Sequence, residues 1–176
     1  MYSAYQKFEK LLHKVEKLFV TIPFFLIFVT VVEQVFQRYF NLPVADTSEI
    51  SMISQAVFTF IGMGMLVYSE DHITIEVHKL IKNVRVLAVV ETIMYLLLIA
   101  FSVLYIYLGA DLMAFALRTG TATTQLRIPL ALPYGAMLVG FACVIIHAVG
   151  KLMRLFVMRG DLESIFNKEA DIEDMR

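Results

Sequence analysis

Two ionisable residues, Glu91 and His147, lie inside long apolar runs of the sequence. Ionisable side chains in a hydrocarbon environment are energetically unfavourable, so they commonly mark buried pairs, proton relays or ligand sites. Glu91 falls about two turns into one run and His147 about one turn from the end of another, so the two can form a hydrogen-bonded pair. Two alternatives stay open: a structural contact of Glu91 with Lys151 or Arg154, and a proton relay or ligand site.

A second pair of charges, Arg38 and Glu49, flanks a short connection that contains Pro43. Arg38 ends the first apolar run and Glu49 begins the second. We predict an ion pair between them that closes this connection. The alternative is contact of one of these residues with an external partner.

Sharp catalytic motifs are missing from the sequence. It contains no HExxH, GxSxG, CxxC, phosphate loop or dinucleotide fingerprint. A haem held by two histidines in the membrane is also disfavoured, because His147 is the only one of the four histidines inside an apolar run. We therefore predict that the chain is not an enzyme and holds no cofactor or metal.

The composition is that of a membrane protein. Of 176 residues, 59% are hydrophobic and 18% are charged, whereas soluble domains carry about 25% charged residues. The net charge of -1 gives no basic face for nucleic acid. We expect contact with a lipid bilayer and none with nucleic acid.

Four apolar runs approach the ~20 residues that cross a bilayer as a helix. They cover residues 18–36, 50–68, 86–108 and 128–150. No small-residue cleavage site follows the first run, so we expect it to be retained. The third run keeps helical character through Arg118 before Gly120, several threonines and Pro129 interrupt it. The sequence predicts an all-α integral membrane fold with four transmembrane helices, forming one domain over residues 1–176.

The positive charges predict the orientation. Twelve of the 15 Lys and Arg residues lie in the two tails and in the connection between the second and third runs. By the positive-inside rule these segments are cytoplasmic, so both termini are inside. Arg118 and Arg127 then lie on the outer side, where they are candidates for contacts with an external protein.

Two segments have the pattern of amphipathic helices that lie at the membrane interface. The N-terminal segment has an apolar stripe of Tyr5, Phe8, Leu12, Val15 and Phe19. The cytoplasmic connection, residues 70–85, has one of Ile73, Val77, Leu80 and Val84. Each stripe could rest on lipid headgroups or cover another subunit.

Stripes of small and polar residues predict where the helices pack, since lipid tails give helices no hydrophobic reason to associate. On the fourth run the stripe is Ala136, Gly140, Cys143, His147 and Gly150. The second run has Ser51, Gln55, Thr59 and Gly62, and the third has Glu91, Tyr95 and Ser102. We expect Gly62 and Gly140 at interfaces between helices or subunits. The stripe of the fourth run is small rather than polar, which favours packing over a pore.

Three stretches resemble a known family. They are "QRYFNLPVADTSEI", which contains Arg38 and Glu49, "GMGMLVYSEDHITIEVHKL" from Gly62, and "TQLRIPLALPYG" from Thr124. They resemble the DctQ-like small membrane subunit of tripartite ATP-independent periplasmic (TRAP) transporters. One departure is that the chain has no Trp, whereas an aromatic residue often precedes the Glu in this family.

The resemblance implies a multi-pass protein of the bacterial inner membrane that acts as a scaffold. In such systems a periplasmic substrate-binding protein delivers an organic acid to a large membrane subunit, which imports it with sodium by an elevator motion. The resemblance leans to the sialic-acid branch over the C4-dicarboxylate branch. It implies that sodium binds to the large subunit and that Arg118 and Arg127 are candidate contacts for the periplasmic protein.

For the cytoplasmic connection, the resemblance favours an elbow that anchors the scaffold through Ile73, Val77 and Leu80. The alternative function is a self-assembling small channel or holin-like protein.

Overall fold

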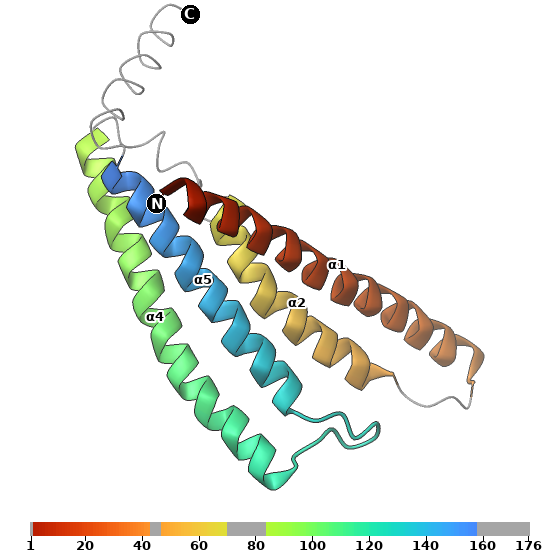
Figure 1. Cartoon of the computed structure of the whole chain (residues 1–176). Helices are drawn as coiled ribbons and strands as arrows, with labels where there is room; N and C mark the ends of the chain where they lie inside the picture. The colour runs from red at the N-terminus through yellow and green to blue at the C-terminus, as the bar shows by residue number, and fades with distance from the viewer. Residues whose placement is uncertain (1, 43–46, 70–83, 158–176) are drawn as a thin grey trace, which may run out of the picture.

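The computed structural model describes residues 2–42, 47–69 and 84–157. Within these ranges the chain forms four helices, α1 (Tyr2–Phe40), α2 (Ser48–Ser69), α4 (Val84–Thr119) and α5 (Ala131–Val157) (Figure 1). Each is long and apolar enough to cross a membrane, over Phe8–Phe40, Ser48–Ser69, Val86–Thr119 and Ala131–Leu155. The predicted all-α fold with four membrane helices is confirmed. Of the predicted elbow, residues 70–83, with Ile73, Val77 and Leu80, lie outside the described ranges.

The first helix is longer than the predicted span. Residues 2–40 form one uninterrupted helix, which joins the predicted interfacial segment to the first span. Phe8, Val15 and Phe19 of the predicted apolar stripe are exposed, whereas Glu9, His13 and Glu16 of the same part of α1 are buried or partly buried. The placement of the N-terminal part at a membrane interface stays a prediction.

Two helices end in the same way at one end of the molecule. Asn41 follows α1 with φ 48° and Gly120 follows α4 with φ 62°. The next amide donates to a carbonyl five residues earlier, Leu42 to Gln37 and Thr121 to Ala116. This is the Schellman arrangement, in which a left-handed residue ends the helix. It explains why the helical character of residues 110–118, predicted from the sequence, stops where it does.

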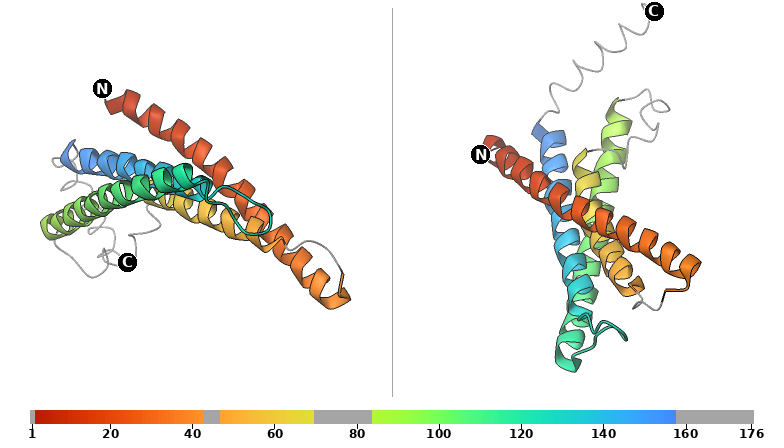
Figure 2. Two further views of the ribbon diagram at one scale, coloured as in Figure 1. Left: turned by 90° about the horizontal axis from the view of Figure 1, so that it is seen from below. Right: turned by 90° about the vertical axis from the view of Figure 1, so that its right-hand side faces the viewer.

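The helices form an open layer. Each packs on the next in the order α4, α5, α2, α1, and α1 makes only a few further contacts with α5. Figure 2 shows α1 running obliquely across the other three helices. We expected the four helices to meet along their stripes. Instead α1 and α4 form the two edges of the layer, since nothing in lipid drives the helices to close around an apolar core.

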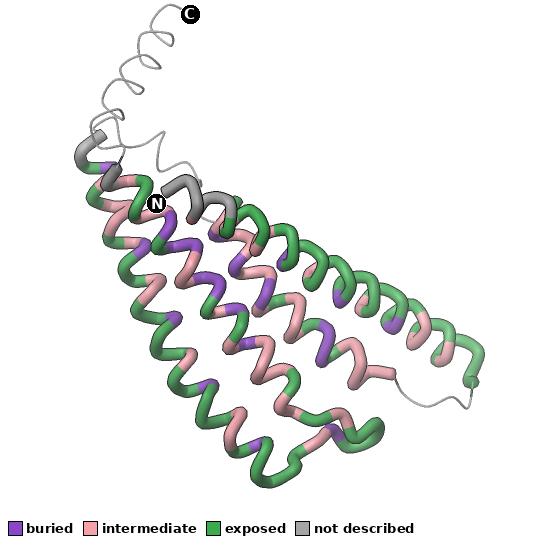
Figure 3. Tube along the Cα trace, viewed as in Figure 1, coloured by how far each residue is buried: buried purple, intermediate pink, exposed green. Residues whose placement is uncertain are grey.

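The proportion of buried residues is highest on the two central helices, α2 and α5 (Figure 3). As the sequence predicted, the stripe of α5 faces protein: Gly140, Cys143, His147 and Gly150 are buried and Ala136 is partly buried. A Cβ atom at Gly140 would collide with the Phe60 carbonyl of α2. On the side towards α4, Val144 and Ala148 form an apolar cluster with Tyr95 and with Val67 of α2.

The protein-facing side of α1 carries small or polar residues together with the partly buried Leu12, Val20 and Ile27, and its outer side is mostly large and apolar. Glu16, Pro23 and Thr30 are buried at intervals of seven residues, whereas phenylalanine, leucine and valine side chains point outward. The Thr30 hydroxyl donates to the Leu26 carbonyl at 2.8 Å, so it is satisfied inside its own helix. This distribution suits a helix that is surrounded by hydrocarbon, where polar groups must find partners within the protein.

We predict that Gly140→Ala separates α2 from α5, because the added methyl group collides with backbone, which cannot rotate away. Overpacking of this kind costs about 1–3 kcal/mol. The variant should therefore unfold at a lower temperature in detergent than the wild type. Gly135→Ala is the matched control, because its Cβ would lie 3.9 Å from the nearest atom, Cε of Met113. Equal melting temperatures for the two variants would contradict the close approach.

Candidate functional site

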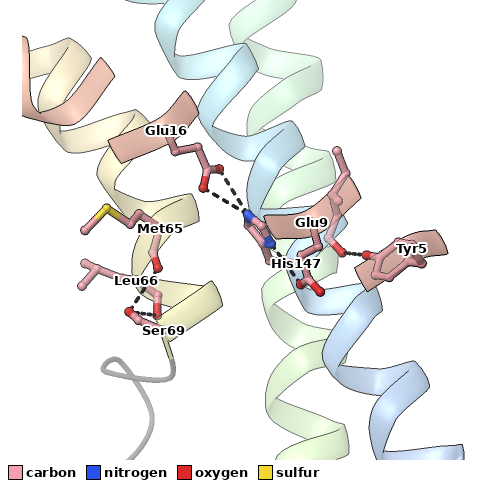
Figure 4. Close-up of polar contacts among 8 residues, drawn as sticks. Tyr5, Glu9, Glu16, Met65, Leu66, Ser69 and His147 are labelled. Atoms are coloured by element: carbon pink, nitrogen blue, oxygen red, sulfur yellow. Dashed lines mark hydrogen bonds and ion pairs between the residues drawn. The ribbon is translucent and has the colours of Figure 1, made fainter. Parts of the chain in front are cut away.

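Three charged or titratable side chains meet where the N-terminal part of α1 crosses α5 (Figure 4). Nδ1 of His147 lies 3.1 Å from Oε1 of Glu9, and Nε2 lies 3.2 and 3.1 Å from the two carboxylate oxygens of Glu16. The exposed side-chain fractions are 0% for His147, 3% for Glu16 and 14% for Glu9. We call this group the Glu9–His147–Glu16 triad.

Helix geometry and two glycines create the room for the triad. Glu9 and Glu16 are seven residues apart, two turns of one face of α1, so they reach the imidazole from opposite sides. A Cβ at Gly64 of α2 would lie 2.7 Å from Oε1 of Glu16, and one at Gly150 of α5 would lie 3.0 Å from Oε1 of Glu9. Small residues at these two positions therefore allow the carboxylates to approach His147.

Aromatic side chains enclose the triad. The Tyr68 ring of α2 meets the His147 ring edge-on at 5.3 Å, and the His13 ring stacks on Tyr68 at 4.2 Å. The Tyr5 hydroxyl donates to the Ile146 carbonyl of α5. Burial and the neighbouring Glu9 carboxylate raise the pKa of Tyr5, which keeps its hydroxyl protonated and able to donate.

The pair of His147 with Glu91 that the sequence allows is not formed, because both ring nitrogens face carboxylates of α1. Glu91 is partly buried on α4 and has a partner of its own. Glu9 and Glu16 were not predicted as site residues, because residues before Leu18 have the pattern of an interfacial helix. A usable signal was the 4–3 spacing of Glu9, His13 and Glu16 on one face.

The triad can hold a proton, but the described residues give it little other chemistry. No group of three or more His, Cys, Asp or Glu residues in the described ranges could hold a metal ion. Cys143 is a buried free thiol one turn before His147. The prediction that the chain carries no cofactor or metal stays a prediction for the whole chain.

A second carboxylate site lies at the opposite end of the layer. Oε1 of Glu49, in the first turn of α2, accepts hydrogen bonds from the Thr124 hydroxyl at 3.0 Å and the Gln125 amide at 2.8 Å. Oε2 accepts one from the Leu126 amide at 2.8 Å. These donors belong to the connection between α4 and α5, so Glu49 fastens that connection to α2.

The connection between α4 and α5 is a small hairpin rather than an open loop. Ala122 and Pro129 form an antiparallel bridge, and the Thr123 amide donates to the Ile128 carbonyl at 2.9 Å. The Thr123 hydroxyl accepts a bond from the Ile128 amide, and Arg127 turns the chain with φ 56°. The hairpin occupies residues that we predicted to open the fourth span, so α5 begins at Ala131 instead of Ile128.

The predicted ion pair of Arg38 with Glu49 is wrong. No ion pair joins these two residues in the structure, and the hairpin supplies the donors to Glu49. Arg38 is exposed in the last turn of α1. Contact of Arg38 with an external partner, the alternative, stays a prediction.

The remaining predicted site residues are placed as follows. Gly140 packs against the backbone of α2 within the same chain. A Cβ at Gly62 would lie 4.0 Å from Cγ2 of Val20 in α1. Arg118 and Arg127 are exposed, and Nε of Arg118 donates to the Ala114 carbonyl at 3.2 Å. Both arginines therefore lie in or beside the hairpin, where their predicted contacts with another protein stay predictions.

We predict that Glu49→Ala releases the hairpin, because three donors lose their acceptor at once. Hydrogen exchange of the Gln125 and Leu126 amides should become roughly tenfold faster. Glu33→Ala is the control: it removes the same charge from α1, where Glu33 accepts a bond from Gln37. Unchanged exchange in Glu49→Ala would show that the hairpin holds its position without the carboxylate.

Comparison with known proteins agrees with this architecture. A sequence model of the family described as "Tripartite ATP-independent periplasmic transporters, DctQ component" matches residues 27–158, which include the C-terminal third of α1 and all of α2, α4, the hairpin and α5. No match was found among curated proteins or among solved structures. The matched range contains His147 and Glu49 but not Glu9 or Glu16. The chain belongs to the DctQ family, the small membrane components of TRAP transporters, and is a multi-pass protein of the bacterial inner membrane.

Proposed function

We propose that this chain is a static scaffold subunit that supports a large elevator-type membrane subunit. That subunit would import an organic acid together with sodium, after delivery by a periplasmic substrate-binding protein. The observation that carries this proposal is the open layer of helices, α4, α5, α2 and α1. A single layer encloses no path across the membrane.

The polar groups of the layer support a role without transport chemistry. The Glu9–His147–Glu16 triad and the Glu49 contacts join helices to one another rather than lining a passage. The hydroxyls of Thr30 and Ser102 donate to carbonyls of their own helices. Transporters instead keep polar groups and broken helices near the middle of the membrane for substrate and ions.

The layer is also fastened at both ends. The triad ties α1 to α5 at one end, and Glu49 ties α2 to the α4–α5 hairpin at the other. Between these two points the backbones of α2 and α5 meet at Gly140. A layer whose helices are joined at three places resists bending. This stiffness suits a subunit that supports another subunit moving within the membrane.

Broad apolar surfaces are available for a membrane partner and for lipid. The exposed side of α4 includes Ile93, Leu97, Phe101, Leu104 and Leu108, and the outer side of α1 is similarly apolar. Helices in a bilayer need close packing to associate. The extended layer of helices offers a large subunit many such packing contacts along its length.

The chemistry of transport would then belong to the partner. We propose an organic acid of the sialic-acid or C4-dicarboxylate type as substrate, and sodium sites on the large subunit. The exposed Arg118 and Arg127 are candidate contacts for the periplasmic protein. We propose that Ile73, Val77 and Leu80 anchor the layer of helices at the cytoplasmic side.

The test is to express the tagged chain with a large TRAP membrane subunit from the same genome, and to measure what elutes with it from detergent. We expect a one-to-one complex. In reconstituted vesicles, sodium-driven uptake of sialic acid or a dicarboxylate should need this chain, with the large subunit alone as control. A homo-oligomer that conducts ions without a partner would overturn the scaffold and favour the channel alternative.

The anchoring residues can be tested in the same system. Replacing Ile73, Val77 and Leu80 with Ser should weaken co-purification, because an apolar stripe would be lost. Replacing Lys79 and Lys82 with Ser is the control, since these residues lie off the stripe in the sequence. If the triple Ser variant assembles and transports like the wild type, the proposed anchor is wrong.

A further inference from the structure

The contacts of His147 constrain its proton count. A neutral imidazole has one N–H donor and one acceptor nitrogen, whereas an ionised carboxylate only accepts. Here both ring nitrogens lie within 3.2 Å of carboxylate oxygens. With a neutral ring and two ionised carboxylates, one of these contacts would bring two acceptors together. The geometry therefore requires one more proton than those three groups ordinarily carry.

The contact with Glu16 indicates where that proton lies. Nε2 is almost equally far from both oxygens of Glu16, 3.2 and 3.1 Å, as expected when one N–H is shared by a carboxylate. A protonated carboxyl would instead present a single hydroxyl oxygen to the ring. Imidazole is also ordinarily a stronger base than a carboxylate. The ring is thus the preferred position for the proton.

We propose that the Glu9–His147–Glu16 triad is a buried proton-binding site, in which an imidazolium held between two carboxylates locks the N-terminal part of α1 to α5. Burial makes the lock depend strongly on the proton, because a buried charge without a partner is far less favourable than a paired one. Glu16 and His147 are both almost inaccessible to solvent. Removing the proton would leave two carboxylates beside a neutral ring.

Other titratable and charged groups lie near the triad on α1, α2 and α5. They are Tyr5 and His13 of α1, Tyr68 of α2, and Cys143 and Lys151, one turn before and after His147 on α5. On α4, Tyr95 packs against Val144 and Ala148, and Glu91 lies one turn before Tyr95 in the sequence. Glu91, Tyr95 and Lys151 have partners of their own. The lysines at positions 10, 14 and 17 are exposed on the outer side of α1. In the described part of the chain, the ring nitrogens contact Glu9 and Glu16.

Nitrogen NMR of the full chain in lipid nanodiscs, with ¹⁵N-labelled histidine, measures the proton count directly. His147→Gln assigns the signals, since the chain has four histidines. Near neutral pH we expect both ring nitrogens of His147 to carry protons. A single protonated nitrogen in the wild type would overturn the proposal.

Glu16→Gln is the sharper variant, because a Gln amide can donate to Nε2 and so removes the need for the extra proton. The ring should then lose one proton and keep the one on Nδ1, which faces Glu9. A ring that stays doubly protonated in this variant would count against the shared role of Glu16. If this variant does not fold, the wild-type spectrum still decides whether the His147 ring carries two protons.

Hydrogen exchange tests the lock. In His147→Gln, amides of residues 6–16 should exchange roughly tenfold faster or more, because two buried carboxylates lose their counter-charge. Combining it with Glu9→Gln and Glu16→Gln should restore much of the protection, since no charge then remains. Equal exchange rates in the single and the triple variant would show that packing, rather than charge, holds α1 against α5. These measurements use the chain without partners, so their failure would leave the scaffold proposal intact.

Discussion

The structure depends on the contact between the backbones of α2 and α5. The chain consists of two helical hairpins, α1 with α2 and α4 with α5, and Gly140 brings α5 against the Phe60 carbonyl of α2. In lipid this approach cannot rely on the hydrophobic effect, so it rests on close packing, which a glycine makes available. The order of the layer follows from it, because α5 already uses its other side for α4.

Charged groups then fix the positions of the helices along one another, which packing alone would leave free to shift. At each end of the layer, a carboxylate of the first hairpin meets the second hairpin: Glu9 and Glu16 at His147, and Glu49 at the amides of Gln125 and Leu126. Hydrogen bonds and ion pairs are directional, so they set the register of two helices in a way that alkyl side chains do not. The two ends use different donors, an imidazole ring and backbone amides with a hydroxyl.

The sequence was sufficient to predict the four helices and the side of α5 that packs against protein. Length and hydropathy predicted four membrane helices, and the stripe containing Gly140, Cys143 and His147 is buried as expected. The partners could not be predicted in the same way. A stripe tells which side of a helix faces protein, but not which helix it faces, and four antiparallel helices can be ordered in several ways. Thus the sequence allowed Glu91 of α4 as a partner of His147, whereas the carboxylates that His147 contacts belong to α1.

The error at Glu49 has another physical cause. The expected pair of Arg38 and Glu49 assumed that opposite charges at one interface attract each other. A carboxylate at the start of a helix is equally satisfied by amides, and those amides become available only when residues 121–130 fold into a hairpin. Such geometry depends on the left-handed conformation of Arg127, which is unusual for a residue that is not glycine.

The order of the helices also governs how the chain is made. Glu9 and Glu16 enter the membrane region on the first helix, and their partner His147 lies on α5, the last helix to leave the ribosome. Until then Glu9 and Glu16 lack the imidazole ring that they contact in the folded chain. A chain whose synthesis stops before α5 therefore keeps both carboxylates without the ring that joins α1 to α5.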